Sequence, residues 1–343
     1  MGLLLWSALL MGAIFAAHWG ADRLSVPLQK LRTRWGFSEA AGAAFVALAT
    51  ASPEIGTNSA SALKGLSDIG LGNLLGSNII SVPAIVGVAY LASQTQSPQD
   101  SMNGYKGPRS PRSTSRLTRV DSWRALRVKP EALTIQAIPY LAVIALAAIL
   151  TIPPSWRGLQ PIDGWIMLAA YGIYVGQALG RKRQPPQPVK WHPPELWGAI
   201  GGMLALAIGA YLIVVATENI VAILGISELI GGLLITSTLS IAPEVFATWS
   251  IARSGQVTAA TTSVIADNIA TMTLAFFPLA LVNVPIQDGR LFAVNLFFVA
   301  LLGGVYAAFI QWGQQDNSFE LWEVGVLVGL YGVYLAVMLL FVL

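Results

Sequence analysis

The segment "ATASPEIGTNSA", residues 49–60, places a proline, a glutamate and several hydroxyl and amide side chains between apolar stretches. Residues 40–49 before it are apolar, and the chain becomes apolar again soon after Lys64. A polar or charged group in an apolar environment costs free energy unless a partner compensates for it. We therefore interpret this segment as a functional interruption of a buried helix.

The composition indicates an integral membrane protein. The chain has 343 residues, of which 55% are apolar and 11% charged, with a mean hydropathy of +0.64. Soluble domains carry about 25% charged residues. The chain has no cysteine, so disulfides and thiolate metal sites are excluded. His18 and His192 each adjoin a tryptophan near the end of an apolar segment, which predicts a position at the membrane interface.

Ten apolar segments are long enough to be membrane helices, which need about 20 mostly apolar residues. The first twenty residues lack Lys and Arg, so we interpret the first segment as a retained helix rather than a cleaved signal peptide. The expected fold is all-α and polytopic. The segments are 2–20, 37–64, 69–92, 133–152, 162–180, 196–217, 225–252, 258–283, 291–312 and 320–343.

Two polar connections divide the chain. Residues 93–132 form a basic loop after the third segment, and the proline-rich stretch 181–195 separates two halves of five helices each. We therefore predict a first repeat over 1–180, a linker over 181–195 and a second repeat over 196–343. Of the 20 Lys and Arg residues, 17 fall in loops on one side. The positive-inside rule makes that side cytoplasmic and places both termini outside.

The second half repeats the first at an offset of 190 residues. Pro53-Glu54 coincides with Pro243-Glu244, and Asn78-Ile79 with Asn268-Ile269. Because each half has an odd number of helices, the second half enters the membrane from the opposite side. The pattern is that of an inverted repeat, whose broken helices are expected to meet near the middle of the membrane.

The chemistry of the two Pro-Glu breaks favours a hard cation. Proline has no N–H, so Pro53 and Pro243 are expected to free the carbonyls of Ala49 and Leu239. Each glutamate then lies in the first turn of a half-helix, where the helix dipole stabilises an anion. Thr50 and Ser240 lie one turn before the two glutamates, on the same face. Carboxylate, hydroxyl and carbonyl oxygens are the ligands that Ca²⁺ prefers.

A second polar stripe lies on each helix that follows. Positions at i, i+4 and i+8 are polar in both halves, inside otherwise apolar helices, and Asp267 adds a third carboxylate at membrane depth. Such a group is functional by default because its burial in lipid is costly. The stripes are Asn73, Ser77 and Ser81, and Ser263, Asp267 and Thr271. Thr57, Asn58 and Ser61 are expected to line the outward path.

The motifs resemble those of a known family. "TASPE" (50–54) followed by "GLGNLLGSN" (70–78) is similar to the first α-repeat of the sodium/calcium exchangers, whose usual form is close to GTSLPE…GNxxGSN. "SIAPE" (240–244) and "SVIADN" (263–268) resemble a divergent second α-repeat.

The resemblance implies a role for particular residues. Glu54 and Glu244 would bind Ca²⁺ and share in Na⁺ binding, with Thr50 and Ser240 beside them. The carbonyls of Ala47 and Ser237 would join Na⁺ sites. Ser77 and Asp267 would form a ligand pair, with Asn73, Ser81, Ser263 and Thr271 as secondary positions. Asp267 stands where the family commonly has Ser, and Ser81 and Thr271 stand where Asn and Asp are common.

The function predicted from these features is secondary antiport of Ca²⁺ against Na⁺ by alternating access. The alternative is an H⁺-coupled Ca²⁺ or Na⁺/H⁺ antiporter in which Asp267 carries the proton. A cation channel would use the same oxygens but fits inverted repeats less well. We expect no enzyme and no cofactor, because no Ser/His/Asp set is present.

The expected partners are inorganic cations and the lipid bilayer. The basic loops are explained by topology rather than by nucleic-acid binding. The expected location is the plasma (inner) membrane, and the oligomeric state is left open.

Overall fold

The computed structural model describes residues 2–36, 47–95, 126–127, 136–153, 156–179, 188–253, 257–312 and 318–342. Within these ranges the chain is almost entirely helical, and every one of the ten predicted segments coincides with helical residues. The first half contains α1 (Gly2–Trp35), α3 (Ser52–Lys64), α4 (Ser67–Gln94), α6 (Ile138–Thr151) and α7 (Pro161–Leu179). The all-α prediction is confirmed.

The second half contains more interrupted helices. It consists of α8 (Pro193–Leu224), α9 (Glu228–Ile230), the π-helical segment η4 (Gly231–Thr236), α10 (Ser237–Ser240), α11 (Ala242–Arg253), α12 (Val257–Ala270), the π-helical segment η5 (Thr271–Ala275), α13 (Phe276–Leu281), α14 (Gly289–Trp312) and α15 (Leu321–Val342). In the described ranges, seven helical stretches are long and apolar enough to cross a membrane. The protein is therefore an integral membrane protein, as its composition indicated.

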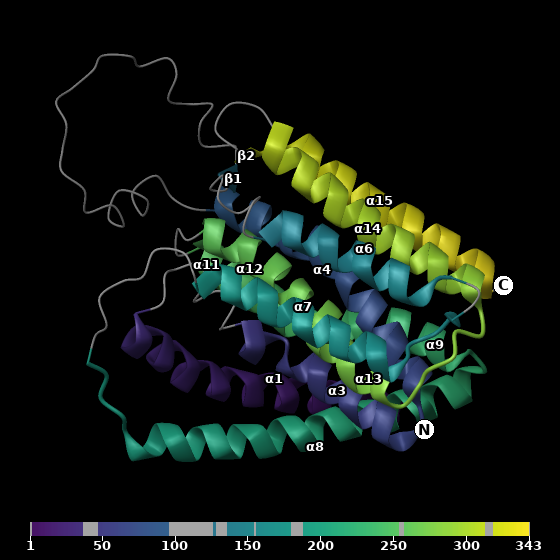
Figure 1. The fold of residues 1–343 in the computed structure, drawn as a ribbon, viewed down its shortest axis with the longest axis horizontal. Helices are drawn as coiled ribbons and strands as arrows, with labels where there is room; N and C mark the ends of the chain where they lie inside the picture. The colour runs from purple at the N-terminus through teal and green to yellow at the C-terminus, as the bar shows by residue number, and fades with distance from the viewer. Residues whose placement is uncertain are drawn as a thin grey trace.

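The short pairings between loops agree with the alternating topology. Strand β1 (Leu126–Arg127) pairs antiparallel with β2 (Ser318–Phe319), which joins the loops after the third and ninth predicted helices. Leu159 forms an isolated bridge with Val284, which joins the loops after the fourth and eighth. Each pairing connects loops that the sequence placed on the same side. Both termini also lie at one end of the bundle, on the right of Figure 1.

Helices α1 and α8 form a pair at one edge of the bundle, opposite α14 and α15 (Figure 1). Their contact is antiparallel and close: a Cβ added at Gly20 would lie 2.3 Å from the Gly202 carbonyl oxygen, and one at Gly209 would lie 2.7 Å from that of Ala13. The pair has its own hydrophobic cluster, separate from the main core. Its buried members are Leu10, Ala13, Ile14, Ala17, Ile213, Ala216 and Ile220.

The first helix is longer than predicted. The sequence placed a loop after residue 20, but α1 continues to Trp35 and carries Arg23, Lys30 and Arg34 on its last turns. Its 34 residues span about 51 Å at about 1.5 Å per residue, against about 30 Å for the hydrocarbon core. The end of α1 therefore extends beyond the membrane, where Lys30 forms an ion pair with Glu195 of α8.

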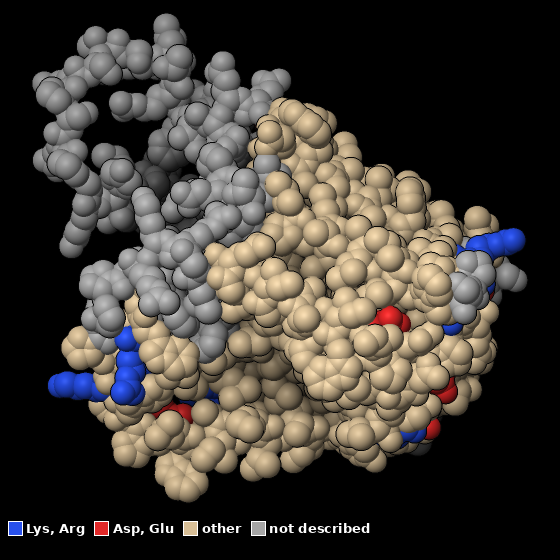
Figure 2. All heavy atoms as spheres, viewed as in Figure 1, with Lys and Arg blue, Asp and Glu red and all other residues tan. Residues whose placement is uncertain are grey.

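Charged side chains lie at the two ends of the bundle in Figure 2, and the middle of the visible face is almost entirely uncharged. This distribution fits a belt of apolar surface in contact with lipid. The structure does not show which end is cytoplasmic, so the predicted orientation stays a prediction.

The two repeats pack crosswise. Helix α3 of the first repeat contacts η5 and α13 of the second, while α11 of the second repeat contacts α4 of the first. The closest approach is between α4 and the consecutive segments α9 and η4. A Cβ at Gly72 would lie 2.2 Å from the Leu229 carbonyl oxygen of α9, and one at Gly232 of η4 would lie 2.2 Å from that of Ile69. This arrangement brings the two Pro-Glu breaks together.

Candidate cation-binding site

The first break lies between residue 50, where a short helical stretch ends, and Ser52, where α3 begins. Pro53 and Glu54 occupy the first turn of α3, as the sequence predicted. The Ala49 carbonyl is not free, however, because the Ser52 hydroxyl donates a hydrogen bond to it at 2.6 Å. The expectation that this carbonyl would be bare was wrong: a hydroxyl takes the place of the N–H that proline lacks.

The second break lies at Ile241, between α10 and α11, and puts Pro243 and Glu244 in the first turn of α11. The Ile241 N–H is shared between the carbonyls of Ser237 and Leu239. The π-helical η4 comes directly before this break, and the Ser237 hydroxyl donates back to the Leu233 carbonyl. Single π-helical turns are uncommon and frequently mark functional sites.

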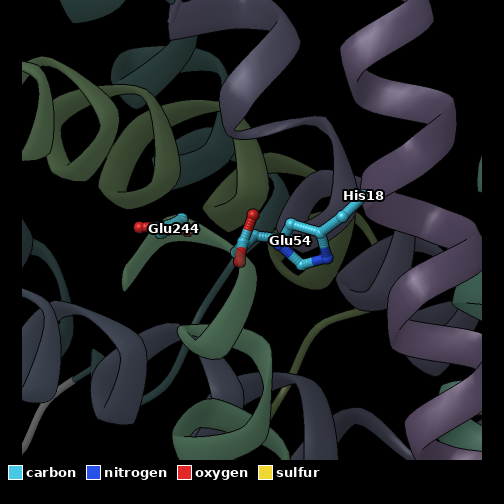
Figure 3. Close-up of side chains that lie close together, drawn as sticks. All are labelled: His18, Glu54 and Glu244. Atoms are coloured by element: carbon cyan, nitrogen blue, oxygen red, sulfur yellow. The ribbon is translucent and has the colours of Figure 1, made fainter. Parts of the chain in front are cut away.

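Glu54 and Glu244 meet where the two breaks face each other (Figure 3). Glu54 is only 3% exposed, and its Oε2 has no hydrogen-bond partner in the described part of the chain. Glu244 is partly buried. One carboxylate oxygen from each lies within 4.8 Å of the other. Two like charges about 4 Å apart repel by about 4 kcal/mol at an effective dielectric constant near 20. A bound cation or a proton would offset this repulsion.

Asp267 joins the two glutamates as a third buried carboxyl group. It is 7% exposed and close enough to interact electrostatically with both Glu54 and Glu244. The Thr50 side chain lies near the Asp267 carboxyl group, and Asp267 Oδ1 has no hydrogen-bond partner among the described residues. Thr50 itself is exposed, so the site is accessible from the protein surface next to Thr50.

The other positions implied by the resemblance lie in the two turns that precede each glutamate in the broken helices. Ser240 is 4% exposed. The Ala47 carbonyl accepts the Ala51 N–H at 2.9 Å and lies 3.3 Å from the Thr50 hydroxyl. The Ser237 carbonyl accepts the Ile241 N–H at 3.2 Å. A carbonyl oxygen has two lone pairs, so an ion at Ala47 would compete with the Thr50 hydroxyl.

The stripe on α4 is buried, but its members differ in what they contact. Ser77 donates to the Leu74 carbonyl at 3.3 Å, and Ser81 donates to Asn268 at 2.9 Å. Asn73 donates to the Asn58 side chain at 3.4 Å and leaves its own oxygen without a partner in the described part of the chain.

The stripe of the second repeat is only partly buried. Thr271 is buried, and its hydroxyl has no partner among the described residues, whereas Ser263 is exposed. Among the secondary positions, Asn73 and Thr271 therefore have free oxygens at depth, Ser81 is bonded to Asn268, and Ser263 lies outside the buried cluster.

The residues expected to line an outward path instead hold helices together. Ser61 donates to the Leu66 carbonyl and accepts the Gly70 N–H at 2.9 Å, which fixes the turn between α3 and α4. Asn58 donates to the Ala275 carbonyl at 3.0 Å and is fully buried. The interpretation of Asn58 and Ser61 as path-lining residues was wrong for this conformation.

Tyr140 of α6 connects equivalent asparagines of the two repeats. Its hydroxyl donates to Asn78 at 3.1 Å and lies 3.4 Å from the Asn268 amide nitrogen. Asn268 also accepts the Ser81 hydroxyl. The paired asparagines found in the sequence are therefore structural contacts between the repeats rather than free ligands.

The position of His18 differs from the prediction. It was expected at the membrane interface, but its imidazole enters the site from α1 and faces Glu54 (Figure 3). Ligand atoms of His18, Glu54 and Glu244 all lie within 4.8 Å of one another. The sequence offered no signal for this position, because an all-round apolar helix gives no periodicity from which to choose a face. In the structure His18 lies one helical turn after the buried Ile14.

A surface cavity of about 370 Å³ lies elsewhere. It is lined by Asp68, Leu71, Gly225, Ile226, Ser227, Leu229, Ile230, Ile286, Gln287, Asp288, Leu291 and Phe292. Its lining includes none of the three site carboxylates. The chemistry of the carboxyl groups, rather than the size of a hollow, identifies the site.

Comparison with known proteins shows the family to which the chain belongs. The family model "Sodium/calcium exchanger protein" matches residues 5–179 and 195–340. A curated relative, the sodium/calcium exchanger MaX1 of Methanosarcina acetivorans, is 35% identical over 100 residues, which is 28% of this chain and 28% of that protein.

Two solved structures share the fold. The sodium-calcium exchanger NCX_Mj, soaked with Na⁺ and Sr²⁺, matches 97% of this chain and 99% of its own, with a TM-score of 0.62 and 20% identity. The H⁺/Ca²⁺ exchanger CAX matches 98% of this chain and 81% of its own, with a TM-score of 0.69 and 15% identity. At these identities the likeness shows the fold alone.

Proposed function

Because the chain belongs to the sodium/calcium exchanger protein family, we propose that it is a secondary antiporter that exchanges Ca²⁺ for Na⁺ by alternating access. The observation that carries the proposal is the meeting of Glu54 and Glu244, one from each inverted repeat, within 4.8 Å at a buried position. Paired broken helices that meet between inverted repeats are the usual ion site of such transporters.

The charge of the site supports competition between one Ca²⁺ and several Na⁺ ions. Glu54, Glu244 and Asp267 together offer up to three negative charges, with Thr50, Ser240 and Ser77 as neutral oxygens nearby. A single Na⁺ leaves the carboxylate pair largely uncompensated, whereas Ca²⁺ accepts six to eight oxygens including carboxylates. We assign Asn73 and Thr271 to a secondary ion position because their buried oxygens lack partners among the described residues.

The α1–α8 pair is the element that we propose to move. It has its own hydrophobic cluster, apart from the core that contains α4 and α12. Its two helices approach closely at Gly20 and Gly202 and are also joined by the Lys30–Glu195 ion pair. A pair that is tightly packed internally can slide as one body against the rest of the protein, and so expose the site to one side or the other.

A second candidate function is H⁺-coupled Ca²⁺ antiport. Two observations favour it: Asp267 is a buried carboxyl group next to both glutamates, and the fold is also similar to that of an H⁺/Ca²⁺ exchanger. In that mechanism Asp267 would take up a proton when Ca²⁺ leaves.

The topology and location are proposals too. We propose repeats at 1–180 and 196–343 around a linker at 181–195, with both termini outside and the plasma membrane as the location.

The test is Ca²⁺ flux into liposomes that contain the purified protein, with Na⁺, H⁺ and K⁺ gradients imposed one at a time. We expect an outward-directed Na⁺ gradient to drive Ca²⁺ uptake, and a proton gradient to have a smaller effect. Uptake driven only by the proton gradient would select the second candidate. Uptake that ignores every imposed gradient would contradict antiport and indicate a channel.

A further inference from the structure

The hydrogen bonding of His18 fixes which of its ring nitrogens can bind a ligand. Nδ1 lies 3.0 Å from the Ile14 carbonyl oxygen. Since a carbonyl can only accept a hydrogen bond, Nδ1 carries the hydrogen and Nε2 of the neutral ring carries the lone pair. Nε2 is buried and has no hydrogen-bond partner among the described residues. This is the usual arrangement of a metal-binding histidine, whose other ring nitrogen donates to a carbonyl or carboxylate.

The neighbours of this nitrogen are carboxylates. Figure 3 shows the His18 ring directed at Glu54, with Glu244 on the far side of Glu54. The three ligand atoms lie within 4.8 Å of one another. Ligands on opposite sides of an ion, each at about 2.1 Å, are about 4.2 Å apart. Small side-chain rotations therefore suffice for one ion to contact all three, and Glu54 Oε2, which has no hydrogen-bond partner in the described part of the chain, is available for it.

We propose that His18, Glu54 and Glu244 form a binding site for divalent transition-metal ions such as Zn²⁺, with Co²⁺ bound more tightly than Mn²⁺. The proposal rests on the proposed function, since it uses the same two glutamates. Na⁺ and Ca²⁺ are satisfied by oxygen and gain little from an imidazole. Transition metals bind imidazole well, and their affinities follow that order.

The position of His18 gives the site a mechanical consequence. Glu54 and Glu244 belong to the core, whereas His18 belongs to the α1–α8 pair that we propose to move. An ion bound to all three residues joins the moving pair to the core. Such an ion competes with Ca²⁺ for the glutamates and slows transport while it is bound.

The first test compares Zn²⁺ and Ca²⁺ in the same liposome assay. We expect Zn²⁺ to inhibit Ca²⁺ flux, and His18→Gln to raise the ratio of the Zn²⁺ inhibition constant to the apparent Ca²⁺ constant at least about tenfold, in line with the cost of disturbing a metal site. His192→Gln is the matched control and leaves the ratio unchanged. An unchanged ratio in His18→Gln would overturn the proposal.

The second test does not depend on the folding of a His18 variant. The chain has two histidines, so His192→Gln leaves His18 as its only imidazole. The protein is purified with a tag that contains no histidine and is loaded with Mn²⁺ or Cu²⁺ as a paramagnetic probe. We expect pulsed electron paramagnetic resonance to show coupling to an imidazole nitrogen. Its absence from metal-loaded protein would overturn the proposal.

The two proposals fail in different ways. If wild-type protein shows no Ca²⁺ flux or binding but His18-dependent Zn²⁺ binding persists, the exchange function is wrong and the metal site stands. If Ca²⁺ flux follows the imposed gradients but neither nitrogen coupling nor a change of the ratio is seen, the exchange function stands and the metal site is wrong.

Discussion

The two Pro-Glu breaks occupy matching positions in the repeats but are built differently. The first break is flanked on both sides by α-helical residues. Glu54 is almost fully buried there, and the Ala49 carbonyl accepts a hydrogen bond from Ser52. The second follows the π-helical η4, and its Glu244 is only partly buried. The inverted symmetry therefore determines where each helix is interrupted, while the side chains around the two interruptions differ.

The halves also differ in the groups that accompany each glutamate. The position of Ser77 in α4 corresponds to Asp267 in α12, so one half has a neutral hydroxyl where the other has a carboxyl group. The residue at the same offset from His18 is Ile208, which is 59% exposed. One half thus contributes a nitrogen and the other an extra charge. We infer that the capacity to bind a cation depends on the matched glutamates, whereas the choice of ion depends on the unmatched residues His18 and Asp267.

The largest effect is expected from the matched pair. Glu54→Gln and Glu244→Gln each remove one carboxylate, a loss of about 4 kcal/mol of charge interaction in a partly screened site, or about a thousandfold in apparent Ca²⁺ affinity. Ca²⁺ flux in liposomes measures the effect, with membrane insertion checked by gel filtration in detergent. Normal flux in either variant would show that the two halves are not equivalent at the site.

The next largest effect concerns the contact that holds the second break in place. Gly232→Ala introduces a Cβ that would lie 2.2 Å from the Ile69 carbonyl oxygen, and forced overpacking costs about 1–3 kcal/mol. We expect a lower melting temperature in detergent. Gly304→Ala in α14 is the control, because its added Cβ meets no atom within 4 Å. Equal stability of the two variants would mean that α4 and η4 are not closely packed.

The unmatched carboxyl group should have a smaller effect on affinity. Asp267→Asn is expected to lower apparent Ca²⁺ affinity about tenfold, or about 1.4 kcal/mol, and to change the pH profile of flux, because one titratable group leaves the site. Ser77→Ala is the matched change in the other half and should stay within about twofold, since Ser77 already donates to Leu74. An unchanged pH profile in Asp267→Asn would leave Asp267 with a structural role.

The smallest effect compares the two asparagines that meet at Tyr140. Asn268→Ala removes two bonds between helices, to Ser81 of α4 and to Tyr140 of α6. Asn78→Ala removes one bond between helices, to Tyr140, and one bond within α4, to the Leu74 carbonyl. Since an unmade buried hydrogen bond costs about 1–3 kcal/mol, Asn268→Ala should be the less stable by about 1 kcal/mol. Thermal unfolding of both variants checks this order. The reverse order would show that the Ser81 contact contributes nothing.

Much of the fold could be predicted from the sequence because membrane insertion leaves few choices. A segment of about 20 apolar residues must be a helix, and the described residues of all ten predicted segments are mainly helical. The repeat was visible because Pro53-Glu54 and Pro243-Glu244 are too costly in lipid to occur without cause. The same cost identified Asp267. The length of α1 beyond residue 20 was missed because polar residues past the membrane give no apolar signal.

Contacts between helices could not be predicted in the same way. The loss of a free carbonyl at Ala49 depends on the rotamer of Ser52, and the role of Ser61 depends on the turn at Leu66. Ser77 and Ser81 lie one turn apart on α4, yet Ser77 bonds within its own helix to Leu74, whereas Ser81 bonds to Asn268 of α12. That difference depends on which residue of the neighbouring helix is within reach. Sequence periodicity gives the face of a helix, not its neighbour.

The sequence by itself determined that this chain crosses the membrane as two inverted halves and that two Pro-Glu breaks place carboxylates at depth. Those features are local: each follows from the free energy of a residue in an apolar helix. Only the tertiary structure decided how close Glu54 and Glu244 lie, that Asp267 interacts electrostatically with both and that His18 faces Glu54 from α1. The packing of α1 against its neighbours sets the direction of that imidazole, and such packing depends on many distant residues together.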